Sequence, residues 1–570
     1  MLLEKIGCKN FSLWDTYDYS LEELEFLINL VSDKNDFPYK SISDGLIDSF
    51  IGINQKLEIS LRNGGNKLAL ASVDETLSYT QLMSKVFSTA VRLRELHINK
   101  GDRIAFQLPN CVDAVVLMLA SLMVGAVPVP ILMTYREREL RHIFDKTGPL
   151  IIAVTCGNLR FSASDVVDNI LREKNLSIIR KLVYKKSENQ HSDWFDLHHF
   201  CSSFENTTFP DNIVDSLSKK DIAMMLLSSG TTGLPKAIAR LNEGYSYMIE
   251  EGCKVFELTN SSVYLAVLPI AHGFVINCPG ILGTLSRGGT VILAPDSSAQ
   301  TSLDLVLSYG VTHTTLVPTI LNLWIEYIEN HPLKLFSLKC IQVGGSRLSA
   351  DLALLAESKL SVKVQQCYGM SEGLLCFTRK FDDVDTRYNS QGKPLSDHDE
   401  ILIVDEKGSP VPTGVSGELI TKGPYTITQY FNDPDANLKS FTLNGYYKTG
   451  DLAHLDELGN VYIDGRVIDV INRSGEKFIP EEIEELLKTH PDIVDAACVG
   501  IPDSKFGEVP CLFLTLNKNN ILTLSDIRRY LEKKGIASFK LPEKIFFLDE
   551  IPRKGIGKID RLLLRKKMKS

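Results

Sequence analysis

Short apolar runs alternate with amphipathic segments from about Pro38 to about Gly465. The runs "IAMMLL", "TVILA" and "CIQV" each end close to a glycine or a proline, as buried strands do. Strands that alternate with helices in this way are typical of an α/β fold, in which helices cover the faces of a mostly parallel sheet. The pattern therefore predicts a large α/β domain over residues 38–466.

A shorter unit with a different pattern follows the run "GNVYIDGR". Pro480 stands at the start of the amphipathic segment "PEEIEELLKTH", a favoured place for proline in a helix. The apolar runs "AACVGI", "CLFLTL" and "KIFFLD" predict strands, and a second helix is expected from about Ser525 to Lys534. We predict a small α+β domain over residues 467–570 and a helical N-terminal extension over residues 1–37.

One segment, from Ala114 to Met133, carries no charge over twenty residues and is long enough to cross a bilayer. Gly125, Pro128 and Pro130 interrupt its second half, where a continuous helix would be broken. We therefore predict a buried helix up to about Val124, followed by a turn and a buried strand, and no membrane span.

Composition narrows the class of protein only slightly. The chain of 570 residues is too long for one hydrophobic core, and its net charge of -9 gives no electrostatic reason to bind nucleic acid. Eleven cysteines are scattered without a C-x-x-C pair, and charges interrupt any apolar core in the N-terminal stretch "MLLEKIGCKN". We expect a cytoplasmic protein with reduced thiols.

The stretch "LLSSGTTGLPKA" suggests phosphate binding. A strand predicted from Ile222 to Leu227 leads into a run of hydroxyl residues and glycines, namely Ser228, Ser229, Gly230, Thr231, Thr232 and Gly233. Glycines let the backbone approach a ligand, exposed N–H groups and hydroxyls donate to anionic oxygens, and Lys236 adds a positive charge. The spacing excludes a Walker A loop, but composition alone leaves a flexible surface turn as an equal alternative.

The same stretch resembles the signature loop of the acyl-adenylate-forming superfamily, which includes acyl-CoA synthetases, peptide-synthetase adenylation domains and luciferases. Further motifs follow in the family's order: "VGGSRLS", "YGMSEG", "GYYKTGD", "DGRVIDVINRSGEKF" and "PRKGIGKIDR". The resemblance covers about residues 40–570. It implies a large multi-sheet adenylating domain, a small mobile C-terminal domain, and ATP-dependent conversion of a carboxylic acid to acyl-AMP with release of pyrophosphate.

The resemblance also implies the nucleotide contacts. The glycine-rich loop and Lys236 would fold over the pyrophosphate portion of ATP. Gly344, Gly345 and Ser346 would lie beside the adenine, and Tyr368 would stack on it. Ser371 would contact the α-phosphate, and Asp451 and Arg466 would bind the ribose.

Two further residues match the family's catalytic positions. Glu372 would hold Mg²⁺, a hard cation that prefers oxygen ligands. Lys558 would bridge the carboxylate and the α-phosphate and so cancel their repulsion in the transition state. Because Lys558 belongs to the small domain, the site is expected to form between the domains. The small domain would then turn about a hinge after Arg466, where Ile468 replaces the usual Asp or Lys.

The stretch "LPIAHGFVINCPGILGTLSRGGTVILAP" resembles the stand-alone aryl-acid adenylating enzymes of siderophore synthesis. It implies a catalytic role for His272 and an acid pocket formed by His272, Gly273, Phe274, Asn277, Cys367 and Leu375. In those enzymes an Asn that meets the ortho-hydroxyl follows the His, whereas this chain has Gly273. A missing amide costs a buried hydroxyl about 1–3 kcal/mol, so we expect an aryl acid but disfavour plain 2,3-dihydroxybenzoate and salicylate. Asn277 either offers the hydroxyl a partner from a different direction or only packs against the backbone. An α-amino acid is disfavoured, because Gly273 cannot bind an ammonium group.

The acyl acceptor is expected to be the phosphopantetheine thiol of a separate carrier protein, as in the siderophore enzymes. Coenzyme A is the alternative acceptor. An acyl-CoA ligase for a different carboxylic acid and a catalytically silent binding module stay as alternative functions. The presence of Lys236, Glu372, Asp451 and Lys558 argues against a silent module.

Overall fold

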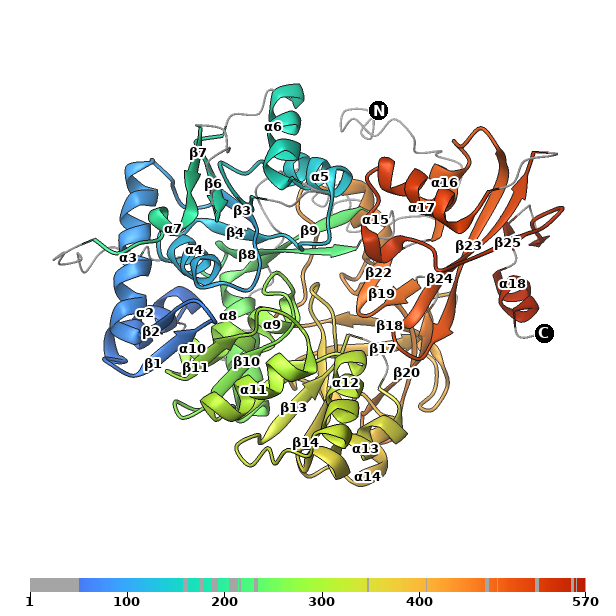
Figure 1. Cartoon of the computed structure of the whole chain (residues 1–570). Coiled ribbons are helices and arrows are strands. Elements are labelled where there is room, and N and C mark those ends of the chain that lie inside the picture. The colour runs from blue at the N-terminus through green and yellow to red at the C-terminus, as the bar shows by residue number, and fades with distance from the viewer. Residues whose placement is uncertain are drawn as a thin grey trace.

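The structure is a computed structural model that describes residues 51–156, 162–174, 178–185, 193–204, 214, 217–229, 234–345, 348–405, 407–466, 471–478, 480–517, 522–554, 558–559 and 561–568. The predicted N-terminal extension, residues 1–37, lies outside these ranges. Among the described residues, no helix combines the length and the apolar character needed to cross a bilayer. Figure 1 shows a large α/β domain and a smaller C-terminal domain beside it, as the sequence predicts.

The largest sheet has the order β16-β15-β14-β13-β12-β10-β11-β1-β2, and its central strands run parallel. Its strands in chain order are β1 (Leu68–Ala71), β2 (Thr76–Ser78), β10 (Val263–Ala266), β11 (Thr290–Leu293), β12 (His313–Leu316), β13 (Cys340–Val343), β14 (Lys363–Gly369), β15 (Leu375–Phe377) and β16 (Lys393–Pro394). The predicted strands "TVILA" and "CIQV" are β11 and β13 of this sheet.

A second parallel sheet, a hairpin and an antiparallel sheet complete the strands of the large domain. The parallel sheet, in its spatial order, contains β4 (Val127–Pro130), β3 (Arg103–Gln107), β5 (Ile151–Thr155), β6 (Arg180–Tyr184) and β7 (Trp194–Asp196). The hairpin pairs β8 (Ile222–Ser229) with β9 (Pro235–Leu241). The antiparallel sheet contains β17 (Glu400–Val404), β18 (Gly417–Lys422), β19 (Tyr447–Leu455) and β20 (Val461–Arg466).

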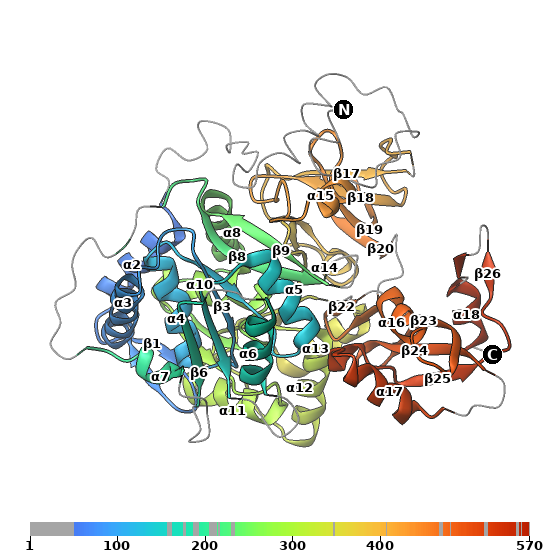
Figure 2. The same ribbon diagram turned by 90° about the horizontal axis from the view of Figure 1, so that it is seen from above.

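Helices of the large domain pack against these sheets (Figure 2). They are α2 (Ile53–Asn63), α3 (Tyr79–Glu95), α4 (Val112–Met123), α5 (Glu137–Thr147), α6 (Ala163–Lys174), α7 (Leu197–Phe200), α8 (Asn242–Val255), α9 (Gly273–Asn277), α10 (Gly280–Ser286), α11 (Ala299–Tyr309), α12 (Pro318–Asn330), α13 (Ala350–Leu360), α14 (Val384–Asn389) and α15 (Pro434–Ser440).

The uncharged segment forms helix α4 and strand β4, which confirms the predicted buried helix and strand. Every residue of both elements is buried. Gly125 makes the turn between them with φ of 72°, a left-handed conformation that glycine adopts without strain. The lack of charge over this segment therefore reflects its burial in the core of the large domain.

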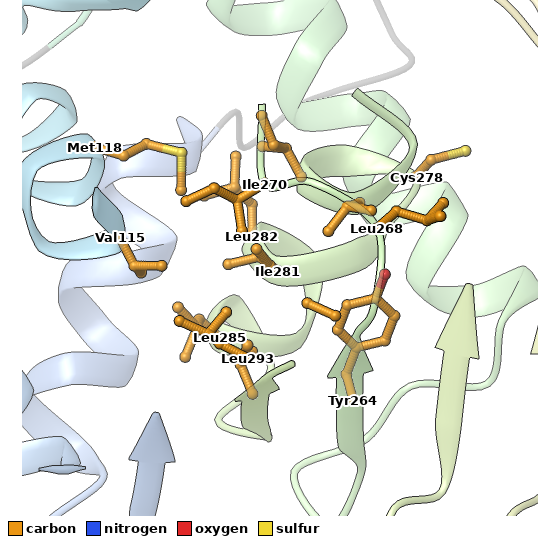
Figure 3. Packing of buried hydrophobic residues seen from close by; sticks show 14 of the residues in the cluster. Val115, Met118, Tyr264, Leu268, Ile270, Cys278, Ile281, Leu282, Leu285 and Leu293 are labelled. Atoms are coloured by element: carbon orange, nitrogen blue, oxygen red, sulfur yellow. The ribbon is translucent and has the colours of Figure 1, made fainter. Parts of the chain in front are cut away.

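The core of the large domain reaches the segment that carries the predicted acid pocket. Val115 and Met118 of α4 pack close to Ile281 and Leu285 of α10 (Figure 3). Cys278, two residues before α10, lies at the edge of this cluster in the same view. Packing against α4 thus fixes the chain that follows His272, so the pocket wall is supported by a rigid core.

The small domain is built on a sheet with the order β22-β21-β24-β23, to which β25 adds beside β24. Its elements are β21 (Ile471–Arg473), β22 (Glu476–Phe478), α16 (Pro480–Leu487), β23 (Ile493–Asp503), β24 (Gly507–Leu516), α17 (Leu524–Lys533), a short 3₁₀ turn (Ser538–Lys540), β25 (Lys544–Phe547), β26 (Arg553–Lys554), β27 (Lys558–Ile559) and α18 (Arg561–Lys567). Both predicted helices are confirmed as α16 and α17. The boundary after Arg466 stays a prediction, because residues 467–470 lie outside the described ranges.

A buried group of charged side chains joins the two domains. Lys540 of the small domain donates to Glu139 of α5 at 3.2 Å and to Glu482 of α16 at 2.9 Å. All three side chains are almost fully buried, and Arg138 of α5 adds an ion pair to Glu482 at 2.9 Å. A buried charge that loses one partner is costly, so this group favours the observed orientation of the small domain.

Candidate active site

A cavity of about 230 Å³ lies where the two domains meet. Its walls come from β8 and β9, from α9 and the residues before it, from the loop after β14, from β19, and from β22 of the small domain. Many of the residues predicted from the motifs line it, namely Ser228, Lys236, His272, Gly273, Phe274, Asn277, Gly345, Cys367, Ser371, Glu372, Leu375 and Asp451. Residues more than 200 positions apart in the sequence are thus brought to one site.

The predicted phosphate loop joins the two strands of the β8–β9 hairpin. Strand β8 runs two residues further than predicted and includes Ser228 and Ser229, because β9 pairs with it as far as Pro235. This register places Lys236 directly opposite Ser228. Residues 230–233, which hold Gly230, Thr231, Thr232 and Gly233, lie outside the described ranges, and so does the side chain of Ser229.

Lys236 is a buried cation beside an aromatic ring. Only 4% of the residue is exposed, and its Nζ lies 4.2 Å from the centre of the Tyr430 ring. The same atom donates to Ser440 Oγ at 3.4 Å. Burial lowers the pKa of Lys236, while Glu372 and Asp433 act in the opposite direction. An anionic ligand in the cavity would add to that opposing effect and favour the charged form.

Glu372 is held by two hydroxyl groups. Its Oε1 accepts hydrogen bonds from Ser228 Oγ at 2.9 Å and from the Tyr430 hydroxyl at 2.9 Å. The hydroxyls of Tyr430 and Tyr447 lie 3.1 Å apart, which extends the network below the carboxylate. The residue is 6% exposed and lines the same cavity as Lys236. This arrangement fixes the position of a carboxylate oxygen that can bind a hard cation.

A hydrogen bond joins Tyr368 to Asp451, which lines the cavity. The Tyr368 hydroxyl donates to Asp451 Oδ2 at 2.7 Å, and Asp451 is 5% exposed. Backbone pairing between β19 and β20 sets Arg466 opposite Asp451, although the side chain of Arg466 is not described. Gly344 packs against Cys367 and Phe274, next to Gly345, while Ser346 lies outside the described ranges.

The predicted acid pocket forms around helix α9. The Nδ1 atom of His272 accepts from the backbone N–H of Phe274 at 3.2 Å and so caps the helix. An accepting Nδ1 leaves the proton of the neutral imidazole on Nε2. Asn277 is buried, and its Oδ1 has no hydrogen-bond partner among the described residues. Cys367 lies with its sulfur 3.9 Å from that of Cys278, and the ten cysteines in the described part of the chain are free.

The cavity also contains residues that the sequence motifs did not single out. Tyr430 and Arg240 belong to none of the sequence motifs, and their neighbours in the sequence do not indicate that they line a ligand site. Gly475 and Glu476 lie within the quoted run "INRSGEKF", where the turn-forming "SG" between two short strands is a signal for a hairpin tip. The structure shows that this tip enters the cavity.

The backbone of Lys558 does not lie beside the residues that line the cavity. It starts β27, which pairs with β26 in a hairpin, and its side chain is not described. Figure 2 shows this hairpin on the side of the small domain that is turned away from the large domain. Strand β22, by contrast, lies next to the large domain. In the observed orientation, therefore, the β21–β22 hairpin occupies the place at the cavity where Lys558 was expected.

A large α/β domain, a small α+β domain and a charged cavity between them define the architecture of an adenylate-forming enzyme. The family model of AMP-binding enzymes matches residues 57–431, and the model of the AMP-binding enzyme C-terminal domain matches residues 482–558. The chain therefore belongs to the AMP-binding enzyme family. It is an ATP-dependent ligase that activates a carboxylic acid as an acyl-AMP.

Individual relatives agree with this family over nearly the whole chain. A 2-hydroxy-7-methoxy-5-methyl-1-naphthoate–CoA ligase of Streptomyces carzinostaticus is 38% identical over 86% of this chain and 88% of its own length. A 2,3-dihydroxybenzoate–AMP ligase of Bacillus subtilis is 32% identical over 88% of this chain and 90% of its own. The apo structure of MbtA from Mycobacterium smegmatis covers 91% of this chain and 95% of its own, with 32% identity and a TM-score of 0.67.

Proposed function

We propose that the activated acid is an aryl acid that carries a ring hydroxyl. The observation that supports this is Asn277, whose buried Oδ1 lines the acid side of the cavity without a partner among the described residues. A buried acceptor left unpaired costs about 1–3 kcal/mol, and a hydroxyl on the substrate would supply the missing donor. The surrounding side chains of Leu226, Phe274 and Leu375 offer apolar contact to a ring.

Gly273 supports an acid larger than a single ring. Its φ does not need glycine, and a Cβ built there would lie 3.4 Å from Asn277 Oδ1 and 3.6 Å from Ser371 Oγ, at ordinary contact distances. The glycine therefore leaves space in the pocket rather than relieving backbone strain. The naphthoate relative is named for a bicyclic hydroxy acid. We infer that this pocket also accepts a hydroxylated bicyclic acid.

A comparison of acids tests this assignment. We expect kcat/KM for adenylation to be about tenfold higher for salicylate and for a hydroxynaphthoate than for benzoate, because only the hydroxy acids pair with Asn277. The measurement is the rate of acid-dependent pyrophosphate release at several acid concentrations. Equal values for salicylate and benzoate would contradict the role of Asn277.

Changing Gly273 to Asn tests the shape of the pocket. The added amide fills space beside Asn277 and provides a second group for an ortho-hydroxyl, so the salicylate-to-benzoate ratio of kcat/KM should rise several-fold. The same side chain overpacks against a second ring, so the value for the hydroxynaphthoate should fall at least tenfold. In Gly273→Asn/Asn277→Ser, which relieves crowding of the two amides, the salicylate ratio should rise further. Unchanged ratios in folded, ATP-binding variants would place the acid elsewhere.

The residues of the cavity fit ATP and a divalent cation. We assign Glu372 to Mg²⁺, which would supply positive charge to the phosphates during attack by the carboxylate. Lys236 and the loop after Ser229 are assigned to the pyrophosphate, Ser371 to the α-phosphate, and Asp451 with Arg466 to the ribose. Tyr368 and the Gly344–Gly345–Ser346 segment are assigned to the adenine. His272, with its proton on Nε2, is assigned to the carboxylate of the acid.

We infer that the small domain turns between the two half-reactions. Lys558 would enter the cavity for adenylation, when its charge is needed between the carboxylate and the α-phosphate. The observed orientation, with β22 in the cavity, would serve acyl transfer. The hinge is placed between Arg466 and Ile471, a stretch that includes Ile468, and the domain boundary at 466 follows from it.

The acceptor is proposed to be a thiol. We favour the phosphopantetheine thiol of a carrier protein, as in the siderophore enzymes that the sequence resembles. Coenzyme A is the second candidate, because the naphthoate relative is named a CoA ligase. Thioester formation by the enzyme with coenzyme A alone would favour the second candidate, whereas a requirement for a holo carrier protein would favour the first. A cytoplasmic location remains part of this proposal.

A further inference from the structure

Glu476 is a carboxylate that the small domain inserts into the cavity. It is the first residue of β22 and lines the same cavity as Ser371 and Glu372. The hairpin tip is held to the large domain, because Asn472 Nδ2 donates to the carbonyl of Gly345 at 3.0 Å. Asn472 Oδ1 also accepts from the N–H of Gly475 at 3.1 Å, where φ of 90° turns the chain into β22. The position of Glu476 is therefore defined by both domains.

The carboxylate of Glu476 is not used in packing the hairpin. Among the described residues it makes no hydrogen bond and no ion pair, and the residue is only half-buried. Lys540 of the small domain acts on the pKa of this carboxylate, and Glu476 in turn helps to raise the pKa of Tyr135 of the large domain. Lys540 itself is bound to Glu139 and Glu482, and the other charged groups of the cavity are Lys236, Arg240, Glu372 and Asp451.

We propose that Glu476 is the general base that accepts the proton of the acceptor thiol during acyl transfer. This proposal rests on the proposed thiol acceptor. The thiol sulfur attacks the carbonyl carbon of the acyl-AMP, a C–S bond forms, and the bond from that carbon to the phosphate oxygen breaks. AMP leaves with the electron pair of the broken bond, and the thiol proton passes to the Glu476 carboxylate and then to water.

The environment of Glu476 suits this role. Burial raises its pKa to about 7, and Lys540 acts in the opposite direction. Alkyl thiols ionise near pH 8.5, so a base with a pKa close to 7 is well matched to take the proton at neutral pH. The base is active only when deprotonated, so its contribution to the rate increases as the pH rises through about 7. No other described carboxylate of the small domain lines the cavity.

The variant Glu476→Gln tests the proposal, since it keeps the size of the side chain and removes the base. Salicyl-AMP and pantetheine are supplied to the enzyme, and thioester formation is followed in single turnovers between about pH 6 and pH 10. General-base catalysis is typically worth 10²–10⁴, so we expect at least a tenfold loss at about pH 7.5. The loss should narrow to a few-fold at the alkaline end, where the thiol ionises by itself. Adenylation, measured by pyrophosphate exchange, should change less than twofold.

Glu139→Gln is the matched control, because it weakens a contact between the domains but changes no side chain that lines the cavity. Relative to the parent enzyme, Glu139→Gln should lose the same fraction of its rate of thioester formation at every pH, whatever the size of that loss. A Glu476→Gln enzyme that transfers at the parent rate, or that shows a similarly flat loss, would overturn the proposal. If the parent enzyme exchanged pyrophosphate but acylated no thiol at all, the thiol acceptor and the role of Glu476 would both be refuted while acid activation stood.

Discussion

Replacing Lys558 with alanine will reduce adenylation by about 10²–10³ and leave acyl transfer from supplied acyl-AMP close to the parent rate. The reason is electrostatic, since the carboxylate and the α-phosphate are both anionic and a lysine between them cancels their repulsion as the bond forms. Acyl transfer does not need this charge in the observed orientation, in which the β26–β27 hairpin faces away from the large domain. The two half-reactions are measured separately, as pyrophosphate exchange and as thioester formation.

The neighbouring residue Lys554 provides a control for Lys558→Ala. It lies opposite Lys558 in the same hairpin, so Lys554→Ala removes an equal charge from the same turn. We expect this control to keep adenylation within a few-fold of the parent. If Lys558→Ala formed acyl-AMP at the parent rate, or if both variants lost adenylation equally, the specific role of Lys558 would be refuted.

Changing Glu372 to Gln should lower adenylation by about 10²–10³ and raise the Mg²⁺ concentration needed for half-maximal rate. The amide keeps the size of the side chain and can still accept from Ser228 and Tyr430, so the local structure should persist. What is lost is the negative charge that a hard cation prefers. The measurement is a Mg²⁺ titration of pyrophosphate exchange at saturating acid, with thermal unfolding as a check on stability.

Ser228→Ala is the matched comparison for Glu372→Gln. It removes one of the two hydroxyls that orient the carboxylate but leaves the charge in place, so adenylation should fall by about tenfold or less. A Glu372→Gln enzyme with the parent dependence on Mg²⁺ would show that another group holds the cation. Equal losses in both variants would instead point to a structural role for the network around Tyr430.

Features set by short stretches of sequence were predictable. The length of α4 and the turn at Gly125 follow from the run of apolar residues and from the glycine and prolines that end it. Pro480 and the apolar spacing after it gave the start of α16. The motifs also pointed to residues that line one cavity: Ser228 and Lys236 lie near strand ends, Glu372 lies in the loop after β14, and Asp451 lies within β19.

Features that depend on long-range contacts were not predictable. Tyr430 orients Glu372 from 58 positions further along the chain, and its local sequence carries no sign of this. The orientation of the small domain depends on Lys540, Glu139 and Glu482, which are ordinary charges in the sequence and become buried partners only after folding. The same contacts bring Glu476 to the cavity in the observed orientation, while the role of Lys558 there stays a prediction.

The central claim, activation of a hydroxylated aryl acid as its adenylate, is tested most directly by acid-dependent exchange of labelled pyrophosphate into ATP. Exchange requires that the enzyme form and reverse an acyl-AMP, and it needs no acceptor thiol. We predict Mg²⁺-dependent exchange with salicylate and a hydroxynaphthoate, weaker exchange with benzoate, and none without an acid. Absence of exchange with every aryl acid, or exchange only with an aliphatic acid such as hexanoate, would contradict the account.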